Sequence, residues 1–426
     1  MKKTIVSLAA AAALTTGAFA ADKGIDIVTT GQAVIYYQTA DKDVKDDKGF
    51  FDDSNSKANV GIQLNLNADL KNNFTFGSQL TYLGTAGLEN NLVDNVMQTN
   101  TSADQTINHD TTNDIMLTKI FVAKKVANTT VKIGRQELPK SLSPLAFSEG
   151  WNVFKNTFDA VLAVNTDLPN TTLVGAFVSK SNASNGDLAK FNDLTTTDMN
   201  VGKGAYMLTA QTTAIPMTTL TASYYHLSNV GHSSLVGSND GNATIAADAI
   251  WIDAKITDKS LPMGLNIGLQ YGNVNPDSNA TLETKDTTAY GIKIGAKPMP
   301  ALTVCAAYTD VDEGTVAVKN TGTGVKTPLY TQMILNQNYI ARDASTYMLK
   351  ASYSLADMGT VTAQYAATDD SNTGGAAKDD NDYNELDLVY TAKFGGVNYL
   401  AAYVMTDADK KDTDADYIRF WARYNF

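Results

Sequence analysis

The sequence predicts an all-β protein, a transmembrane antiparallel β-barrel, and three observations support this fold class. Apolar and polar residues alternate with a period of two through many segments of about ten residues, as in strands that have one apolar face. The connections between these segments are short and long in turn. The last segment, DYIRFWARYNF, runs to the final residue of the 426-residue chain and ends on an aromatic ring.

The clearest strand is residues 58–70, where every even-numbered residue is apolar and every odd-numbered residue is polar or glycine. Eleven residues at about 3.3 Å each, tilted by about 40°, rise about 28 Å, which is enough to cross an apolar band of about 25 Å. Without the two least regular segments, 27–37 and 130–136, the count is sixteen strands rather than eighteen. The full set of expected strands is 27–37, 58–70, 73–83, 114–126, 130–136, 157–165, 171–180, 204–214, 218–226, 247–257, 263–272, 287–296, 300–309, 344–354, 359–367, 382–394, 396–405 and 416–426.

The connections alternate in length, which predicts short turns at one end of the barrel and long loops at the other. This asymmetry is typical of outer-membrane barrels, whose short turns are periplasmic and whose long loops are extracellular. Glycine, proline, asparagine and aspartate are frequent in both sets, as turn chemistry requires. The short connections are 71–72, 127–129, 166–170, 215–217, 258–262, 297–300, 355–358 and 395–396, and the long ones include 39–56, 84–113, 137–156, 181–203, 228–246, 310–343, 368–381 and 406–415.

The C-terminal strand, residues 416–426, has one apolar face and one charged face. Tyr424 and Phe426 share the apolar face, and we expect them to act as the C-terminal signal of the barrel. Arg419 and Arg423 lie on the other face, toward a watery lumen. Because an unpaired strand edge is not tolerated in hydrocarbon, this strand must pair with the first one.

The N-terminus predicts an exported protein. Residues 1–20 have a lysine-containing start, an apolar run and a final Ala-Phe-Ala, the pattern of a cleaved signal peptide, so the barrel domain is expected to span residues 21–426. Removing Lys2 and Lys3 leaves 31 basic against 45 acidic residues, a net charge of −14, which argues against a nucleic-acid partner. Cys305 is the one cysteine, so an intrachain disulfide is excluded.

Residues 117–180 resemble a known family. The segments that carry the resemblance are Gly134-Arg135-Gln136, Pro144-Leu145, residues 157–160 and the turn at 169–172. They are similar to the major outer-membrane porins of epsilonproteobacteria, the Campylobacter-type group. The resemblance implies an eighteen-stranded homotrimer with the third long loop folded into the lumen, and a modest cation preference. Members usually have Glu where this chain has Asp159.

If the barrel is a porin, its function depends on the constriction and on the charges of the lumen. The third long loop, from about Glu137 to Asn156, is where the resemblance places the constriction. Arg135 shares the face of Val131 and Ile133, which should meet lipid, so we expect the strand to end at Gly134 or a bulge to turn the arginine into the lumen. The expected constriction residues are Arg135, Glu137, Lys140, Glu149, Trp151, Lys155 and Asp159.

The polar face of the other strands supplies the expected pore lining. Any single charged residue there can instead have a structural role, because it can pair with a residue on a neighbouring strand and keep the wall hydrated. The basic candidates are Lys132, Lys255, Lys293, Lys350, Lys393, Arg419 and Arg423, and the acidic ones are Asp69, Asp253, Glu385 and Asp387.

The sequence therefore predicts an outer-membrane porin of a Gram-negative bacterium, in contact with lipid and lipopolysaccharide, that passes ions and small hydrophilic solutes. A substrate-specific channel and a surface adhesin or structural barrel stay as alternatives. No cofactor is expected, although the acidic loops at 41–54, 368–382 and 406–416 could hold calcium in place of a purely solubilising role. The histidines at 109, 226 and 232 have no metal-ligand spacing, and no hydrolase or phosphate-binding motif is present, so an enzyme is not expected.

Overall fold

The structure is a computed structural model of the whole chain. It describes residues 25–426 except for 44–47, 89–91, 99–113, 151–152, 183–187, 189–190, 194–203, 232–243, 279–283, 324, 371–381 and 410–413. The expected signal peptide, His109, Trp151 and His232 lie outside the described residues, as do most of the acidic loop at 368–382 and parts of the other two.

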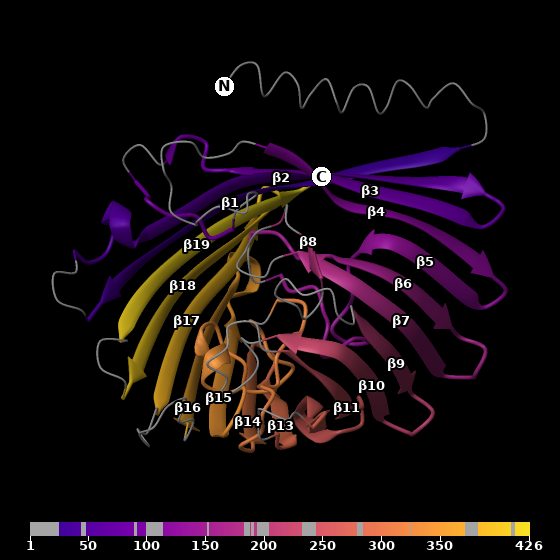
Figure 1. Cartoon of the computed structure of the whole chain (residues 1–426). Helices are drawn as coiled ribbons and strands as arrows, with labels where there is room; N and C mark the ends of the chain where they lie inside the picture. The colour runs from indigo at the N-terminus through magenta and orange to yellow at the C-terminus, as the bar shows by residue number, and fades with distance from the viewer. Residues whose placement is uncertain are drawn as a thin grey trace.

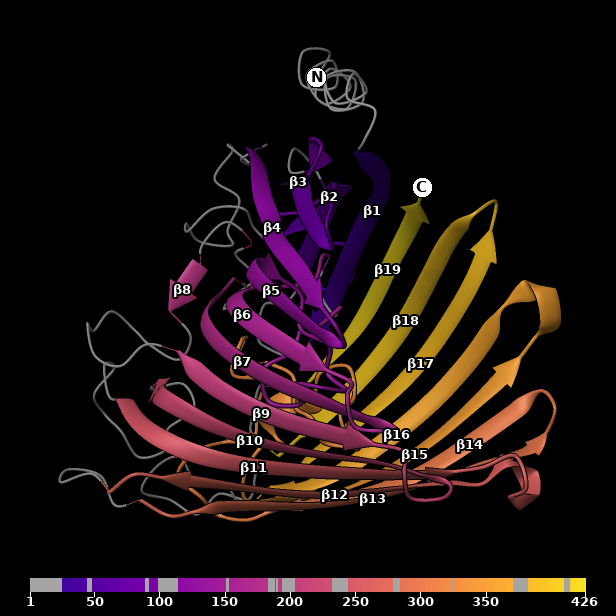
Figure 2. The same cartoon turned by 90° about the vertical axis from the view of Figure 1, so that its right-hand side faces the viewer.

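One closed antiparallel sheet forms the wall. Among the described residues the sheet has nineteen strands, and it closes because β1 pairs with both β2 and β19. Strand β8 has three residues and pairs with β7, which also pairs directly with β9, so eighteen strands make up the barrel itself (Figures 1 and 2). The strands are β1 Asp26–Lys42, β2 Ser56–Lys71, β3 Phe74–Gly84, β4 Asp114–Val126, β5 Thr129–Gln136, β6 Phe158–Asn165, β7 Thr171–Asn182, β8 Phe191–Asp193, β9 Ala205–Thr212, β10 Thr218–Gly231, β11 Thr244–Thr257, β12 Asn266–Pro276, β13 Thr287–Met299, β14 Leu302–Val311, β15 Ala344–Ser354, β16 Thr360–Asp370, β17 Tyr383–Phe394, β18 Val397–Ala408 and β19 Ala415–Asn425.

The predicted barrel is confirmed strand by strand. The two least regular segments are both wall strands, β1 and β5. Several strands extend further toward the long loops than the alternation indicated, as β1 does by reaching Lys42. The alternation stops where the wall rises above the apolar band, because polar residues are then tolerated on both faces.

The barrel closes at the residue that ends the chain. The backbone amide of Gly31 donates to the carbonyl of Phe426 at 2.6 Å, and the amide of Phe426 donates back at 3.0 Å. The ring of Phe426 lies over Gly31, where a Cβ atom would approach the ring to 2.3 Å. Glycine therefore makes room for the terminal ring, and this contact completes the outer face at the junction of the first and last strands.

The outer face is apolar across the wall, as the alternation predicts. Ile133 and Leu349 are 56% and 63% exposed. Phe420 and Tyr424 share the outer face of β19, and Phe426 follows directly after the strand. Exposure of this kind over a whole sheet is stable only against lipid.

Tyrosines mark the loop end of this apolar face. Four of them donate their hydroxyls to a polar side chain that lies nearer to the long loops. An aromatic body in the apolar layer with its polar tip in water is the arrangement of an interfacial girdle. The pairs are Tyr224 with Asp248, Tyr308 with Asp310, Tyr365 with Asn384 and Tyr403 with Asp416.

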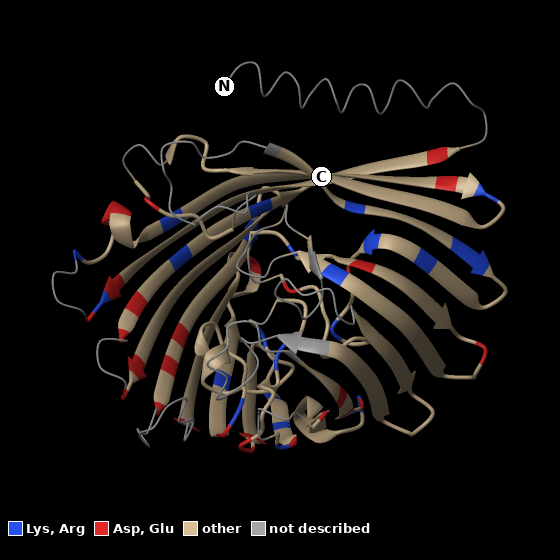
Figure 3. Ribbon diagram, viewed as in Figure 1, with Lys and Arg blue, Asp and Glu red and all other residues tan. Residues whose placement is uncertain are grey.

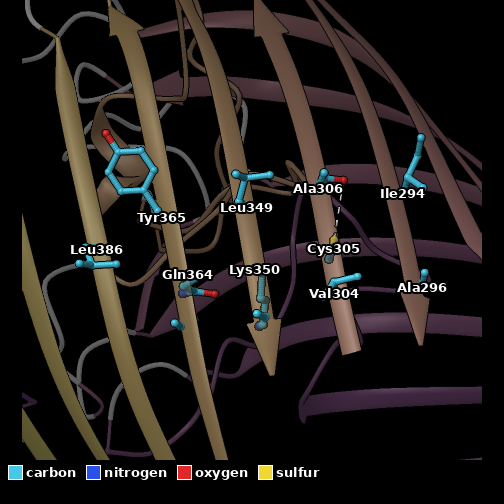
Figure 4. A pocket seen from close by; sticks show the side chains of 12 residues that line it. Ile294, Ala296, Val304, Cys305, Ala306, Leu349, Lys350, Gln364, Tyr365 and Leu386 are labelled. Carbon is cyan, nitrogen blue, oxygen red and sulfur yellow. Dashed lines mark hydrogen bonds between the residues drawn. The ribbon is translucent and has the colours of Figure 1, made fainter. Parts of the chain in front are cut away.

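A shallow hollow of about 640 Å³ interrupts the wall across β13–β17 (Figure 4). Small outward residues stand in register there: Ala296 opposite Val304, Val304 opposite Ala351, and Ala351 opposite Ala363. Cys305 lies on the inner side of the same strands, packed against the cluster around Ala307. Cys305 is therefore a small packing residue on the lumen face.

Among the described residues, short 3₁₀ turns lie at Asp53–Asn55, Pro262–Gly264, Asn336–Asn338 and Ala356–Met358, and Leu88 also has 3₁₀ geometry. No helix of the described residues is long and apolar enough to cross a membrane.

Candidate functional site

The third long loop, residues 137–157 between β5 and β6 and here called loop 3, crosses the lumen. On one side Leu145 donates its backbone amide to the hydroxyl of Tyr225, an inward residue of β10, at 3.3 Å. On the other side the buried ring of Phe154 lies on Gly61 of β2, where a Cβ atom would be 2.4 Å from the ring. Loop 3 thus reaches strands on two sides of the barrel, and its expected infolding is observed.

A second loop crosses the lumen as well, and the sequence analysis did not predict it. Residues 312–343 between β14 and β15, the seventh long loop and here called loop 7, lie inside the ring of strands (Figure 1, orange). Ser181 of β7 donates to the carbonyl of Gly322 at 2.6 Å, and Leu335 donates its amide to Glu385 of β17 at 2.8 Å. Since β7 and β17 are nine positions apart around the eighteen-stranded wall, loop 7 spans its full width.

The two loops are bonded to each other. The buried side chain of Asn320 accepts from the amide of Phe147 at 3.0 Å and donates to the Phe147 carbonyl and to Glu149, both at 2.8 Å. The Lys140 ammonium donates to the Thr327 carbonyl at 3.0 Å. The constriction is therefore one connected unit made of loops 3 and 7.

Two cavities remain beside this unit. One of about 710 Å³ lies against β1–β3 and β19 and is lined by amides such as Gln63 and Gln79 together with Lys119, Glu137 and Arg423. The other, of about 430 Å³, lies between loops 3 and 7 and strands β10–β13. Both have polar and charged linings, which is what a water-filled passage requires.

Glu137 is the acidic centre of the larger cavity. It forms ion pairs with Lys119 and, at 3.2 Å, with Lys155. Burial raises the pKa of Glu137, but the two ammonium groups outweigh it, so the pKa lies below its usual value. Glu137 is therefore charged at neutral pH, and Glu137 and Lys155 lie where the sequence placed them.

Glu149 and Lys140 also lie in the constriction, where both join loops 3 and 7. Glu149 is 7% exposed and accepts hydrogen bonds from Asn320 and Thr323. Lys140 is oriented along loop 7 by its bond to Thr327 and lines the smaller cavity.

The expected lumen position of Arg135 is wrong, and so is that of Asp159. Strand β5 keeps its register through Arg135, which stays on the outward face of Ile133 because no bulge turns it inward. Arg135 binds Asp159 with Nε and Nη2, at 2.9 and 3.2 Å, and stacks on Phe191 at 3.2 Å from the ring centre. The ion pair neutralises a charge that bare exposure to lipid would make costly.

Three expected pore-lining residues are buried under loops or neighbours. Glu385 is 1% exposed and accepts the Leu335 amide of loop 7, and Asp387 is fully buried and accepts from Gln364. Arg419 is 4% exposed and donates to Gln38. These charges hold loop 7 and the wall in place, so they do not line open water.

The remaining lining candidates lie on the inner face. Lys132 lies over the ring of Phe121 at 3.7 Å. Arg423 donates to Gln32 at 3.2 Å beside the larger cavity. Lys350, Lys393 and Asp69 are exposed on the inward positions of β15, β17 and β2, and Asp253, Lys255 and Lys293 line the smaller cavity. Most of these inner-face residues are basic, whereas Figure 3 shows acidic residues at the long-loop ends of β17–β19.

Three residues of the constriction were not predicted from the sequence: Lys119, Asn320 and Tyr330. Lys119 was hidden by the register shift next to it in β4, which breaks the alternation. The residues of loop 7 left a visible signal: the loop contains Val316, Val318 and other apolar residues that are buried, although an ordinary external loop is polar.

This geometry defines a class of protein: a closed transmembrane barrel with a polar lumen narrowed by inward loops, which is the construction of a channel. Comparison with known proteins agrees. Residues 263–426 match the family model described as Gram-negative porin. No curated protein matches the chain by sequence.

Solved structures share the fold over nearly the whole chain. OccK8 (OprE) of Pseudomonas aeruginosa is similar with a TM-score of 0.71 and 14% identity over 94% of this chain and 98% of that one. OccAB3 of Acinetobacter baumannii has a TM-score of 0.71 and 14% identity over 93% and 99%. OpdO of Pseudomonas aeruginosa has a TM-score of 0.69 and 14% identity over 94% and 97%. Residues 263–426 are thus similar to Gram-negative porins, and the solved structures show the fold of nearly the whole chain.

Proposed function

We propose that the chain forms a general porin, a water-filled outer-membrane channel for passive diffusion of ions and small hydrophilic solutes. The observation that carries the proposal is the polar lumen, in which loops 3 and 7 leave cavities of about 710 and 430 Å³. The two loops would limit the size of a solute that can pass, and the charges of the lumen would favour one sign of charge.

A substrate-specific channel is the second candidate, and the bond between the two loops favours it. Asn320 and Lys140 hold loops 3 and 7 together, so the cavities have defined walls. A rigid wall can select a solute by shape and charge, whereas separate mobile loops would select by size alone.

The same proposal includes three further points. The chain belongs to the epsilonproteobacterial porin group, it forms a homotrimer, and residues 1–20 are removed on export. They rest on the resemblance of residues 117–180 and on the signal-peptide pattern. The resemblance implies a modest cation preference, yet Lys119, Lys155 and Arg423 surround one cavity and three lysines line the other. Selectivity therefore depends on whether the acidic loop ends or the basic lumen dominates.

Planar bilayers test the proposal. The purified, refolded protein is expected to give stepwise conductance, in groups of three for a trimer, with a non-zero reversal potential under a salt gradient. The sign of that potential decides between the acidic mouth and the basic lumen. A folded barrel that never conducts would overturn the porin proposal and favour a surface or structural role.

A further inference from the structure

We propose that the cavity of about 430 Å³ between loops 3 and 7 and strands β10–β13 binds small, multiply charged oxyanions, of which inorganic phosphate is the simplest. This inference rests on the proposed function, because a solute reaches the cavity only through an open lumen.

Three lysines from three separate elements converge on the cavity. Lys140 comes from loop 3, Lys255 from β11 and Lys293 from β13, and all three line the same space. The acidic group among the lining residues is Asp253, so the cavity has an excess of positive charge. Converging ammonium groups are a common way to hold an oxyanion.

The single carboxylate is largely engaged by neutral partners. Asp253 accepts from the hydroxyl of Tyr330 at 2.9 Å and from the amide of Gln270 at 3.0 Å, while Lys255 lies 3.5 Å away. Lys293 has its ammonium 4.3 Å from the centre of the Tyr330 ring. Asp253 therefore fixes the loop 7 tyrosine and offsets only part of the positive charge.

Polar groups of neutral residues complete the lining. Gln270 lines the cavity and donates its amide to Asp253, while its carbonyl oxygen Oε1 is buried in the wall beside Gly291. Ser141 and Thr221 add hydroxyl groups to the same wall. The separate oxygens of an oxyanion such as hydrogen phosphate can accept from several of these hydroxyl and ammonium donors at once, so this lining suits it better than it suits chloride.

Keeping Lys140 protonated in this position costs free energy when no anion is bound. The pKa of Lys140 is lowered to about 8, chiefly by burial and also by the neighbouring Lys255 and Lys293, while Asp253 and Glu149 oppose the shift. Like charges held together at a functional site are relieved by a bound opposite charge. Phosphate in the cavity would stabilise the protonated lysine in the place where loop 3 holds it.

The first test is the block of channel current by phosphate. Wild-type channels in potassium chloride are expected to lose conductance as potassium phosphate is added. The double variant Lys255→Gln/Lys293→Gln should need about tenfold more phosphate for the same block, because two ammonium groups are gone. Lys350→Gln removes an inner-face lysine of β15 outside the cavity and should keep the wild-type concentration for half block.

The outcomes separate this inference from the proposed function. Open channels that phosphate does not block, or that it blocks equally in the double variant, would overturn the anion site and leave the porin intact. Absence of conductance in folded wild-type protein would overturn the porin instead. Acetate, with one charge, should block much less than phosphate, and equal block by acetate would contradict the preference for multiple charge.

A pH series on the wild-type channel gives a second readout. Phosphate is already a dianion above about pH 8, so its own charge then stays constant. Lys140 loses its proton over the same range, facing Lys255 and Asp253 of β11, Lys293 of β13 and Glu149 of its own loop. The block should therefore weaken between pH 8 and pH 9.5, and a block that strengthens would contradict the inference.

Discussion

Loops 3 and 7 both cross the lumen, but they are held in different ways. Loop 3 is anchored at its far end by an apolar contact, the buried ring of Phe154 on Gly61, within the cluster that includes Val34 and Tyr36. Loop 7 is held by buried polar groups, among them Asn320 and Lys326. An apolar anchor is tolerant of small shifts, whereas a buried polar network depends on every partner being present.

The comparison explains why only one of the two loops was predicted. Loop 3 follows a strand whose motif resembles a known family, and the resemblance carried its infolding. Loop 7 has no such motif. Apart from apolar residues such as Val316 and Val318, its anchors are polar and resemble the residues of an external loop until their partners are known. A buried asparagine cannot be told from an exposed one by residue type alone.

The largest expected effect comes from removing the apolar anchor of loop 3. Phe154→Ala should destabilise the docked loop by about 3–4 kcal/mol, because a fully buried ring is lost from a packed site. The released loop should raise single-channel conductance and make it noisy, and hydrogen exchange in residues 143–156 should become faster. Phe51→Ala is a matched control, since Phe51 is 66% exposed in an outer loop. Unchanged conductance and exchange in Phe154→Ala would show that the ring does not hold the loop.

The link between the loops gives the next effect. Asn320→Ala removes two donated and two accepted hydrogen bonds at a fully buried position, at a cost of about 2–3 kcal/mol. Because the amide bonds Phe147 and Glu149, exchange should become faster in loop 3 as well as in loop 7. Asn338→Ala, in the same loop but bonded to Lys319 at an exposed position, should leave loop 3 unchanged. A response confined to loop 7 would show that the loops move independently.

The wall was predictable to within a few residues because its two solvents impose a strict period of two on every strand. The candidate site was predictable only in part. Glu137 and Lys155 lie where loop position and charge indicated, since both begin or end loop 3 at the wall. Arg135 was expected to avoid the lipid by a bulge, whereas in the structure it stays on the outward face and pairs with Asp159. Ion pairing across strands depends on register, and register is not visible in one segment alone.

The smallest expected effect concerns the ammonium of Lys326, which fixes the polar core of loop 7. It donates to the carbonyls of Met333 and Ile334 at 3.0 and 2.8 Å and to Gln337 at 3.1 Å. Burial lowers its pKa to about 7, against the opposing effect of Glu149 and Glu385. In a released loop the pKa would return to about 10.4.

The released loop therefore binds more protons than the docked loop between these two values, so docking strengthens as the pH rises through that window. Protection of loop 7 from hydrogen exchange, corrected for the intrinsic rate, should increase by about 1 kcal/mol between pH 8 and pH 9. Lys326→Met should remove most of this dependence, and the part that remains should have the same sign, because Lys140 of loop 3 also has a pKa lowered to about 8. Protection that falls over this range in the wild type would mean that charged Lys326 stabilises loop 7, and that the polar network, unlike the apolar anchor of loop 3, depends on its charge.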